Sequence, residues 1–108
     1  MRLRRYEELE DHCAYEFAPE HVYRGREHWQ PEYRYLPWEE FGPLAQALLQ
    51  IIPNYNEYGP EKLTLSQWDR AEAQCLGQHP EERAFFASVR QWLDRENRGA
   101  DTFWILGP

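Results

Sequence analysis

The sequence predicts a compact α+β domain that is mainly helical, with about three main helices and a small sheet that includes the carboxy-terminal strand. Apolar residues recur at helical steps of three and four in three stretches between residues 38 and 97. The run TFWIL at residues 102–106 is β-branched and aromatic, which is typical of a buried strand. A chain of 108 residues has room for one hydrophobic core, so residues 1–108 are expected to form a single domain.

The first 36 residues have the weakest pattern. Apolar residues fit a helical step through about residue 11, and from Cys13 to Phe17 they alternate with polar residues as they do in a strand. We therefore expect a short helix followed by a strand that ends at Phe17, before Pro19. Residues 20–36 contain only short apolar runs and are expected to be extended pieces or loop.

The most apolar helical face lies in residues 38–52. It consists of Trp38, Phe41, Leu44, Ala45, Leu48, Ile51 and Ile52. Gly42 and Pro43 interrupt this pattern, because an interior proline removes a backbone hydrogen bond and clashes with the preceding turn. The sequence therefore predicts a break at residue 42 and a helix over residues 43–51.

A second helix is expected over residues 67–76. A short strand over residues 62–65 precedes it, and Ser66 with Asp69 three residues later can cap its start. Gly77 is expected to end this helix.

The clearest helix begins at Pro80, which suits a first helical position. Gly99 stands where a left-handed cap is expected after it. Trp104 is then expected at the centre of the terminal core strand. The apolar face of the helix consists of Phe85, Phe86, Val89, Trp92 and Leu93.

Composition places the chain among folded proteins. Hydrophobic residues make up 42% and aromatic residues 16%, which supplies a core that disordered chains lack. No stretch approaches the roughly 18 apolar residues of a membrane span, and no apolar run follows the first arginines as in a signal peptide. We expect a soluble, cytoplasmic protein without membrane contact, in which Cys13 and Cys75 are reduced and packed as small apolar groups.

The net charge of −7 repels nucleic acid and anionic lipid, so we expect a basic protein partner and no direct nucleic-acid binding. The negative charge is concentrated in residues 37–72. There Lys62 and Arg70 are outnumbered by Glu39, Glu40, Glu57, Glu61, Asp69 and Glu72.

The candidate binding site is the loop between Pro53 and Pro60. Its rigid, amphipathic tyrosines are of the kind enriched at protein interfaces, and the acids would complement a basic partner. The alternative is a turn whose tyrosines fold back on the core. The predicted partner-binding residues are Tyr55, Asn56, Glu57, Tyr58, Glu61, Glu39 and Glu40.

No motif for catalysis or for a cofactor is present. The histidines and cysteines lack the paired close spacing of zinc sites, and no phosphate-binding glycine loop occurs. Cys75 and His79 could pair as nucleophile and base, but Gly77 and Pro80 separate them and no orienting group follows. Acids in the first turn of a helix account for Glu39 and Glu40 without a catalytic role. We expect no enzyme activity, no cofactor and no metal.

The stretch LPWEEFGPLAQALLQIIPNYNEYGP at residues 36–60 and the closing TFWILG resemble small acidic immunity proteins of bacterial polymorphic and contact-dependent toxin systems. The resemblance lies in size, acidity and aromatic content over about a third of the chain. It implies a protein that binds a cognate toxin domain, such as a nuclease, and blocks its active site. The alternative function is a regulatory adaptor without inhibitory action, or a nucleic-acid mimic, that binds a basic partner.

Overall fold

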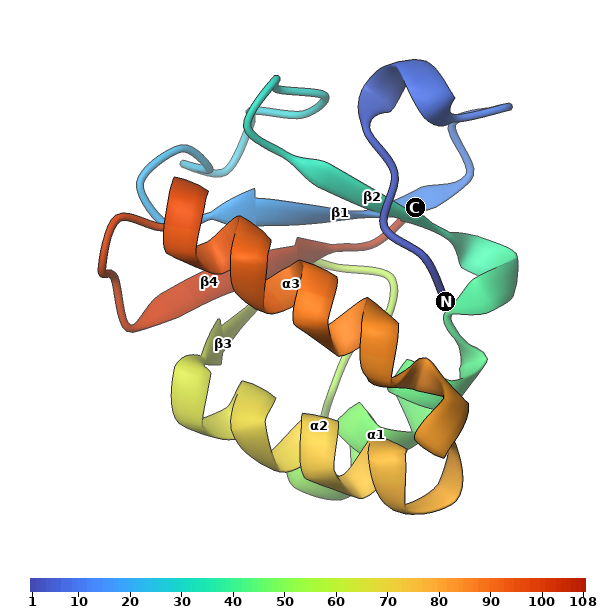
Figure 1. Cartoon of the computed structure of the whole chain (residues 1–108). Helices are drawn as coiled ribbons and strands as arrows, with labels where there is room; N and C mark the ends of the chain where they lie inside the picture. Colours follow the sequence, from blue (N-terminus) through green and yellow to red (C-terminus); the bar gives the residue numbers. More distant parts are fainter.

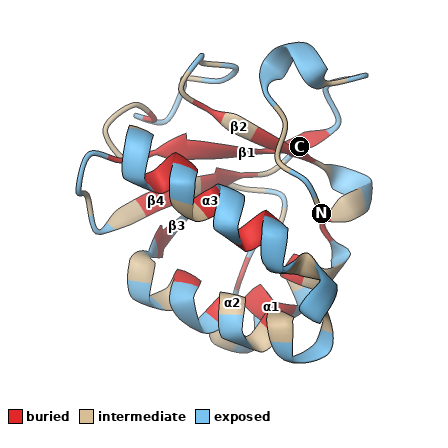
Figure 2. Ribbon diagram, viewed as in Figure 1, coloured by how far each residue is buried: buried red, intermediate tan, exposed pale blue.

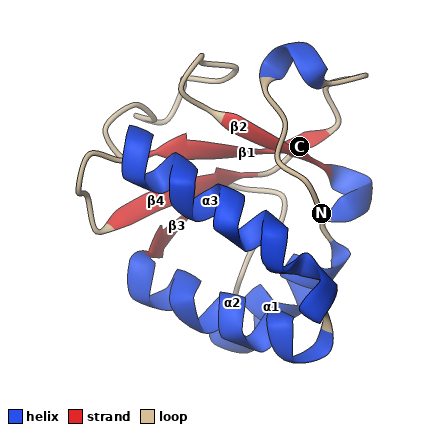
Figure 3. Ribbon diagram, in the orientation of Figure 1, coloured by secondary structure: helices blue, strands red, loops and turns tan.

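The computed structural model describes residues 1–108 and has the predicted α+β architecture, with about 44% of residues helical (Figure 1, Figure 3). Four strands form one antiparallel sheet: β1 (Ala14–Pro19), β2 (Arg34–Pro37), β3 (Glu61–Thr64) and β4 (Thr102–Leu106). The helices are α1 (Gly42–Ile51), α2 (Leu65–Gln78) and α3 (Arg83–Glu96). Single 3₁₀ turns lie at η1 (Tyr6–Glu8), η2 (Trp38–Glu40) and η3 (Pro80–Glu82).

The last strand of the chain lies inside the sheet, as the apolar carboxy-terminal run predicts. The strand order is β2-β1-β4-β3, and β4 pairs antiparallel with both β1 and β3. Phe17 of β1 is opposite Ile105, and Leu63 of β3 is opposite Phe103. These four side chains are buried on the face of the sheet that the helices cover.

Trp104 faces the other way, because successive side chains of a strand alternate between the two faces. Its ring lies edge-on to Tyr23 with 5.0 Å between centroids, and the Lys62 ammonium lies 5.6 Å from its centroid. The prediction that Trp104 is the core residue of this strand is therefore wrong. Phe103 and Ile105 have that role.

The three helices cover one face of the sheet and enclose the main core (Figure 1, Figure 2). Phe17 lies at its centre, since its ring makes edge-on contacts with Trp68 of α2 and with Phe85 and Trp92 of α3 at 6.1–6.3 Å between centroids. All five residues of the predicted apolar face of α3 are buried. The periodicity therefore identified the inward face of this helix correctly.

A break is present, but it lies at Phe41, one residue before the predicted position: η2 ends at Glu40, and α1 runs from Gly42 to Ile51 with Pro43 in its first turn. The separation into two pieces turns Trp38 outward, and its side chain is 56% exposed. Its assignment to the core face was wrong, because the helical period does not extend across the break.

α2 is longer at both ends than the sequence predicts. Its cap is Thr64 in place of Ser66: the Thr64 hydroxyl accepts from the Gln67 backbone N–H at 3.0 Å, and the Gln67 side chain accepts from the Thr64 N–H at 2.9 Å. Gly77 lies inside α2 and does not end it. Gly99 does adopt the left-handed conformation expected after α3, with φ of 77°.

The first 36 residues differ from the prediction in detail. The only helical turn before β1 is η1, and β1 continues past Phe17 to Pro19. Residues 20–33 are loop, as expected, and they bring Tyr23 and Tyr33 onto the outer face of the sheet beside Tyr35. Both faces of the sheet are therefore covered by aromatic side chains.

Both cysteines are free thiols, as expected, but only Cys75 is packed in the core, and Cys13 is exposed. No helix in the structure combines the length and the apolar character needed to cross a membrane.

Candidate protein-binding site

The loop between α1 and β3 is held by its own polar groups. The Asn56 side-chain oxygen accepts from the Tyr58 backbone N–H at 3.0 Å, which closes a turn over residues 56–58. The Asn56 backbone N–H donates to the Glu61 carboxylate at 2.8 Å, and the Tyr55 N–H donates to the Ile52 carbonyl at 2.9 Å. Asn56 and Glu61 thus shape the loop, which leaves less of their polar surface for a partner.

Gly107, near the end of the chain, packs directly against the same loop. A Cβ atom added to Gly107 would lie 2.6 Å from the carbonyl carbon of Tyr58 and 2.7 Å from the Glu57 oxygen. Only a residue without a side chain allows this approach. The backbone of Glu57 and Tyr58 therefore rests directly on the segment that follows β4.

The two tyrosines of the loop differ in exposure to solvent. Tyr58 is the most exposed large apolar side chain of the molecule, at 78%, whereas Tyr55 is only 8% exposed and belongs to the core. Burial, followed by the negative charge of Glu61, raises the pKa of Tyr55. Tyr55 therefore follows the alternative prediction of a tyrosine folded back on the core, and its prediction as a surface anchor is wrong. Tyr58 remains available to contact a partner.

The predicted acids also separate into two groups. Glu57 and Glu39 form no ion pair, so their charges are free to act on a partner. Glu40 forms a two-pronged ion pair with the Arg4 guanidinium, with both distances at 2.7 Å. The hydrogen bond from Arg4 lowers the pKa of Glu40. Its carboxylate therefore ties the N-terminal segment to η2.

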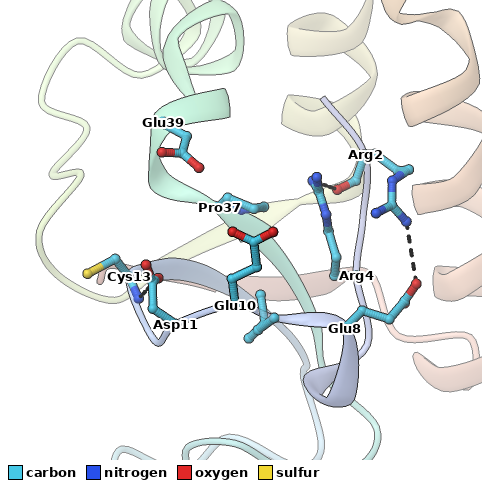
Figure 4. Close-up of a pocket in the computed structure, with 9 residues that line it drawn as sticks. Arg2, Arg4, Glu8, Glu10, Asp11, Cys13, Pro37 and Glu39 are labelled. Atoms are coloured by element: carbon cyan, nitrogen blue, oxygen red, sulfur yellow. Dashed lines mark hydrogen bonds and ion pairs between the residues drawn. The ribbon is translucent and has the colours of Figure 1, made fainter.

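Glu39 borders a surface hollow that is rich in acids, shown in Figure 4. In this view Glu10 rises from the N-terminal segment toward Pro37, and Asp11 lies beside Cys13. The Asp11 carboxylate accepts from the Cys13 backbone N–H at 2.9 Å. Because Arg2 and Arg4 also border the hollow, the acids outnumber the bases there only modestly.

Tyr15 of β1 is buried beside the residue that follows η2. Its ring stacks on Phe41, directly after η2, with 3.7 Å between centroids. Burial and then the negative charge of Glu57 raise the pKa of the Tyr15 hydroxyl. Tyr15 therefore lies against the residue that follows η2, and it belongs to the same core cluster as Tyr55 of the loop.

The outer face of the sheet holds a polar arrangement that sequence reasoning missed. Glu16 of β1 is 2% exposed, and its carboxylate binds the His28 ring nitrogen Nδ1 at 2.6 Å and the Trp29 backbone N–H at 2.8 Å. Trp29 has φ of 57°, which is rare for a bulky residue and strains the backbone. The one sequence signal was an acid between two aromatic residues in a strand, Tyr15 and Phe17.

This arrangement places an oriented imidazole beside the loop. His28 lines a shallow surface hollow together with Tyr23, Tyr58 and Gly107. A histidine held by a carboxylate can act as a base, but the lining of this hollow includes no serine, threonine or cysteine to activate. The Cys75 thiol lies elsewhere in the core, where burial raises its pKa and so weakens it as a nucleophile.

No group of three or more histidine, cysteine, aspartate or glutamate side chains is arranged to hold a metal ion. Comparison with protein-family models, with curated proteins and with solved structures finds no significant match.

Proposed function

We propose that this chain is an immunity protein that binds a cognate bacterial toxin domain stoichiometrically and neutralises it. The observation that supports this most directly is the display of Tyr58, 78% exposed, on a loop that is fixed by hydrogen bonds and by the close approach of Gly107. A large side chain on a preorganised loop loses little entropy on binding, which suits an interface anchor.

The second support is the presence of acids that form no ion pair. Glu57 and Glu39 are in no ion pair within the molecule, so their charges can accelerate encounter with a basic surface. Trp38, next to Glu39 in the sequence, adds a second exposed aromatic ring. It takes over the role of second anchor that was predicted for Tyr55, which is buried. The proposed surface therefore consists of Tyr58, Glu57, Trp38 and Glu39.

The test uses the product of the gene adjacent to the one that encodes this chain. That product is expressed alone and together with the chain, and cell survival is recorded. The proposal expects the neighbour to be toxic alone and harmless with the chain, and the two proteins to copurify as a complex of fixed stoichiometry.

Variants show whether the proposed surface is responsible. Tyr58→Ala is expected to reduce protection, whereas Leu49→Ala, which truncates another exposed apolar side chain on α1, is expected to leave it unchanged. A neighbour that is harmless and does not bind contradicts the immunity function. A neighbour that binds without being toxic supports the adaptor function instead.

A further inference from the structure

A surface hollow between the N-terminal segment, β2 and α3 gathers arginines in a chain whose net charge is −7. We call it the arginine hollow, and its polar lining includes Arg4, Arg5, Glu8, Arg34, Gln91 and Arg95. Three separate elements supply these residues, and the N-terminal segment crosses β2 beside α3 (Figure 1). Arg4 and Tyr35 hold the segment there through reciprocal backbone hydrogen bonds of 2.8 and 2.9 Å.

Two of the four arginines that line the arginine hollow have no ion-pair partner. Arg4 is paired with Glu40, but Arg5 and Arg34 form no ion pair. Arg95 approaches only its own neighbour on α3, Glu96, at 3.7 Å. The other carboxylate of the lining, Glu8, accepts from the Arg5 backbone N–H at 2.7 Å and from Arg2 at 3.4 Å.

Arg34 is the central residue of this cluster. Its Nη1 donates to the Tyr33 carbonyl at 2.8 Å and to the Pro31 carbonyl at 3.4 Å, whereas its Nε and Nη2 groups have no acceptor in the protein. Burial, and then the positive charges of Arg95 and Arg5, lower the pKa of Arg34. Because Arg5, Arg34 and Arg95 line the same hollow, their like charges repel one another, and a bound anion would replace this repulsion by attraction.

We propose that the arginine hollow binds a phosphate group, with Arg5, Arg34 and Arg95 as its ligands. The planar guanidinium presents paired N–H donors that match the oxygens of a phosphate, so several arginines around one anion form strong, directional hydrogen bonds. The Gln91 amide on α3 lies on the same lining and adds a neutral donor.

A neighbouring hollow indicates which phosphate compounds fit. It shares Arg5 and Arg34 with the arginine hollow and is also lined by Tyr6, whose exposed ring lies 6.0 Å from that of Trp29. A phosphate between the two arginines therefore has an aromatic surface beside it, on which a nucleobase can stack. The net charge disfavours a polyanion, so the two sources of the phosphate group are inorganic phosphate and a mononucleotide.

The test is calorimetric titration of the whole chain at fixed ionic strength with inorganic phosphate, adenosine monophosphate and adenosine. Phosphate and the monophosphate are expected to bind saturably with one site, and adenosine is expected not to bind. A monophosphate that binds at least tenfold more tightly than phosphate identifies the nucleotide as the source, and Tyr6→Ala should then remove the difference. Equal affinities identify inorganic phosphate.

Substitutions locate the site. Arg34→Gln is expected to weaken phosphate binding at least tenfold, and Arg34→Lys, which keeps the charge but loses the paired donors, should also weaken it. Arg70→Gln removes the same charge from an exposed position on α2 and should leave affinity unchanged. Absence of saturable binding, or equal losses in Arg34→Gln and Arg70→Gln, would overturn the proposal. Circular dichroism verifies the fold, and Arg5→Gln with Arg95→Gln replaces Arg34→Gln if that variant unfolds.

Discussion

Replacement of Gly107 by alanine tests whether the end of the chain supports the exposed loop. The added Cβ would meet the backbone of Tyr58 at 2.6 Å, which is well inside the ordinary contact range of 3.4–4 Å. Neither contact atom belongs to a flexible side chain, so the backbone of residues 57 and 58 or of residue 107 must move. Forced shifts of this kind cost about 1–3 kcal/mol, a large part of the about 5–15 kcal/mol by which a domain is stable.

Gly77→Ala is a matched control for which we expect a change in the free energy of unfolding of the opposite sign. Gly77 lies inside α2, and nothing lies within 4 Å of the position of its added Cβ. Alanine there should stabilise the protein by about 0.4–1 kcal/mol, because the unfolded chain loses conformational freedom. Urea denaturation measures both free energies, and amide chemical shifts report on residues 57 and 58. A Gly107→Ala variant as stable as the parent, with unchanged shifts at these amides, would refute the close approach.

Four further substitutions test other parts of the fold. Phe103→Ala should destabilise by about 3–5 kcal/mol and Trp104→Ala by clearly less, because only Phe103 lies in the main core; equal thermal shifts would contradict the observed register. Thr64→Ala should cost about 1 kcal/mol in urea denaturation by removing the cap of α2, and a neutral outcome would mean that the cap is replaced. The ion pair with Arg4 lowers the pKa of Glu40 below 4.5, so its stabilisation is complete above that pH and is lost as pH falls through the lowered value. Acid unfolding of Glu40→Gln should therefore be less steep below about pH 4.5 than that of the parent.

Elements with long, regular periodicity could be predicted from the sequence. The apolar face of α3 follows from spacing alone, because a helix repeats every 3.6 residues whatever it packs against. The strand at residues 102–106 was also identifiable, but which of its residues face the core was not. Trp104 was expected in the core because it is the central residue of the run. The face is instead set by the register with β1 and β3, which brings together distant parts of the chain.

The candidate site shows the same limit. The loop over residues 53–60 was marked by its prolines, yet nothing local distinguishes Tyr55 from Tyr58. The first is drawn into the core and the second is held outward by the Asn56 turn. The buried Glu16 could not be assigned either, because its partners His28 and Trp29 lie in a loop without periodic pattern.

The arginine hollow depends entirely on tertiary structure. Arg5, Arg34 and Arg95 are far apart in the sequence, and the acids Glu7 and Glu8 that follow Arg5 suggest local neutralisation there. The fold places the three on one surface, with Glu8 as the one carboxylate of the lining.

The most direct test of the proposed binding surface is the dissociation rate of Tyr58→Ala from the product of the adjacent gene, measured by surface binding kinetics. An anchor that is 78% exposed in the free protein and desolvated in the complex should contribute about 2 kcal/mol or more, almost all of it in the dissociation rate. Glu57→Gln with Glu39→Gln should instead slow association and flatten its salt dependence, whereas Asp94→Asn on α3, an exposed acid outside the surface, should change neither rate. Dissociation at least tenfold faster for Tyr58→Ala, with parental rates for Leu49→Ala, is the predicted result. Tight binding whose dissociation rate is the same in the parent and in a correctly folded Tyr58→Ala variant would contradict it and place the interface on another face.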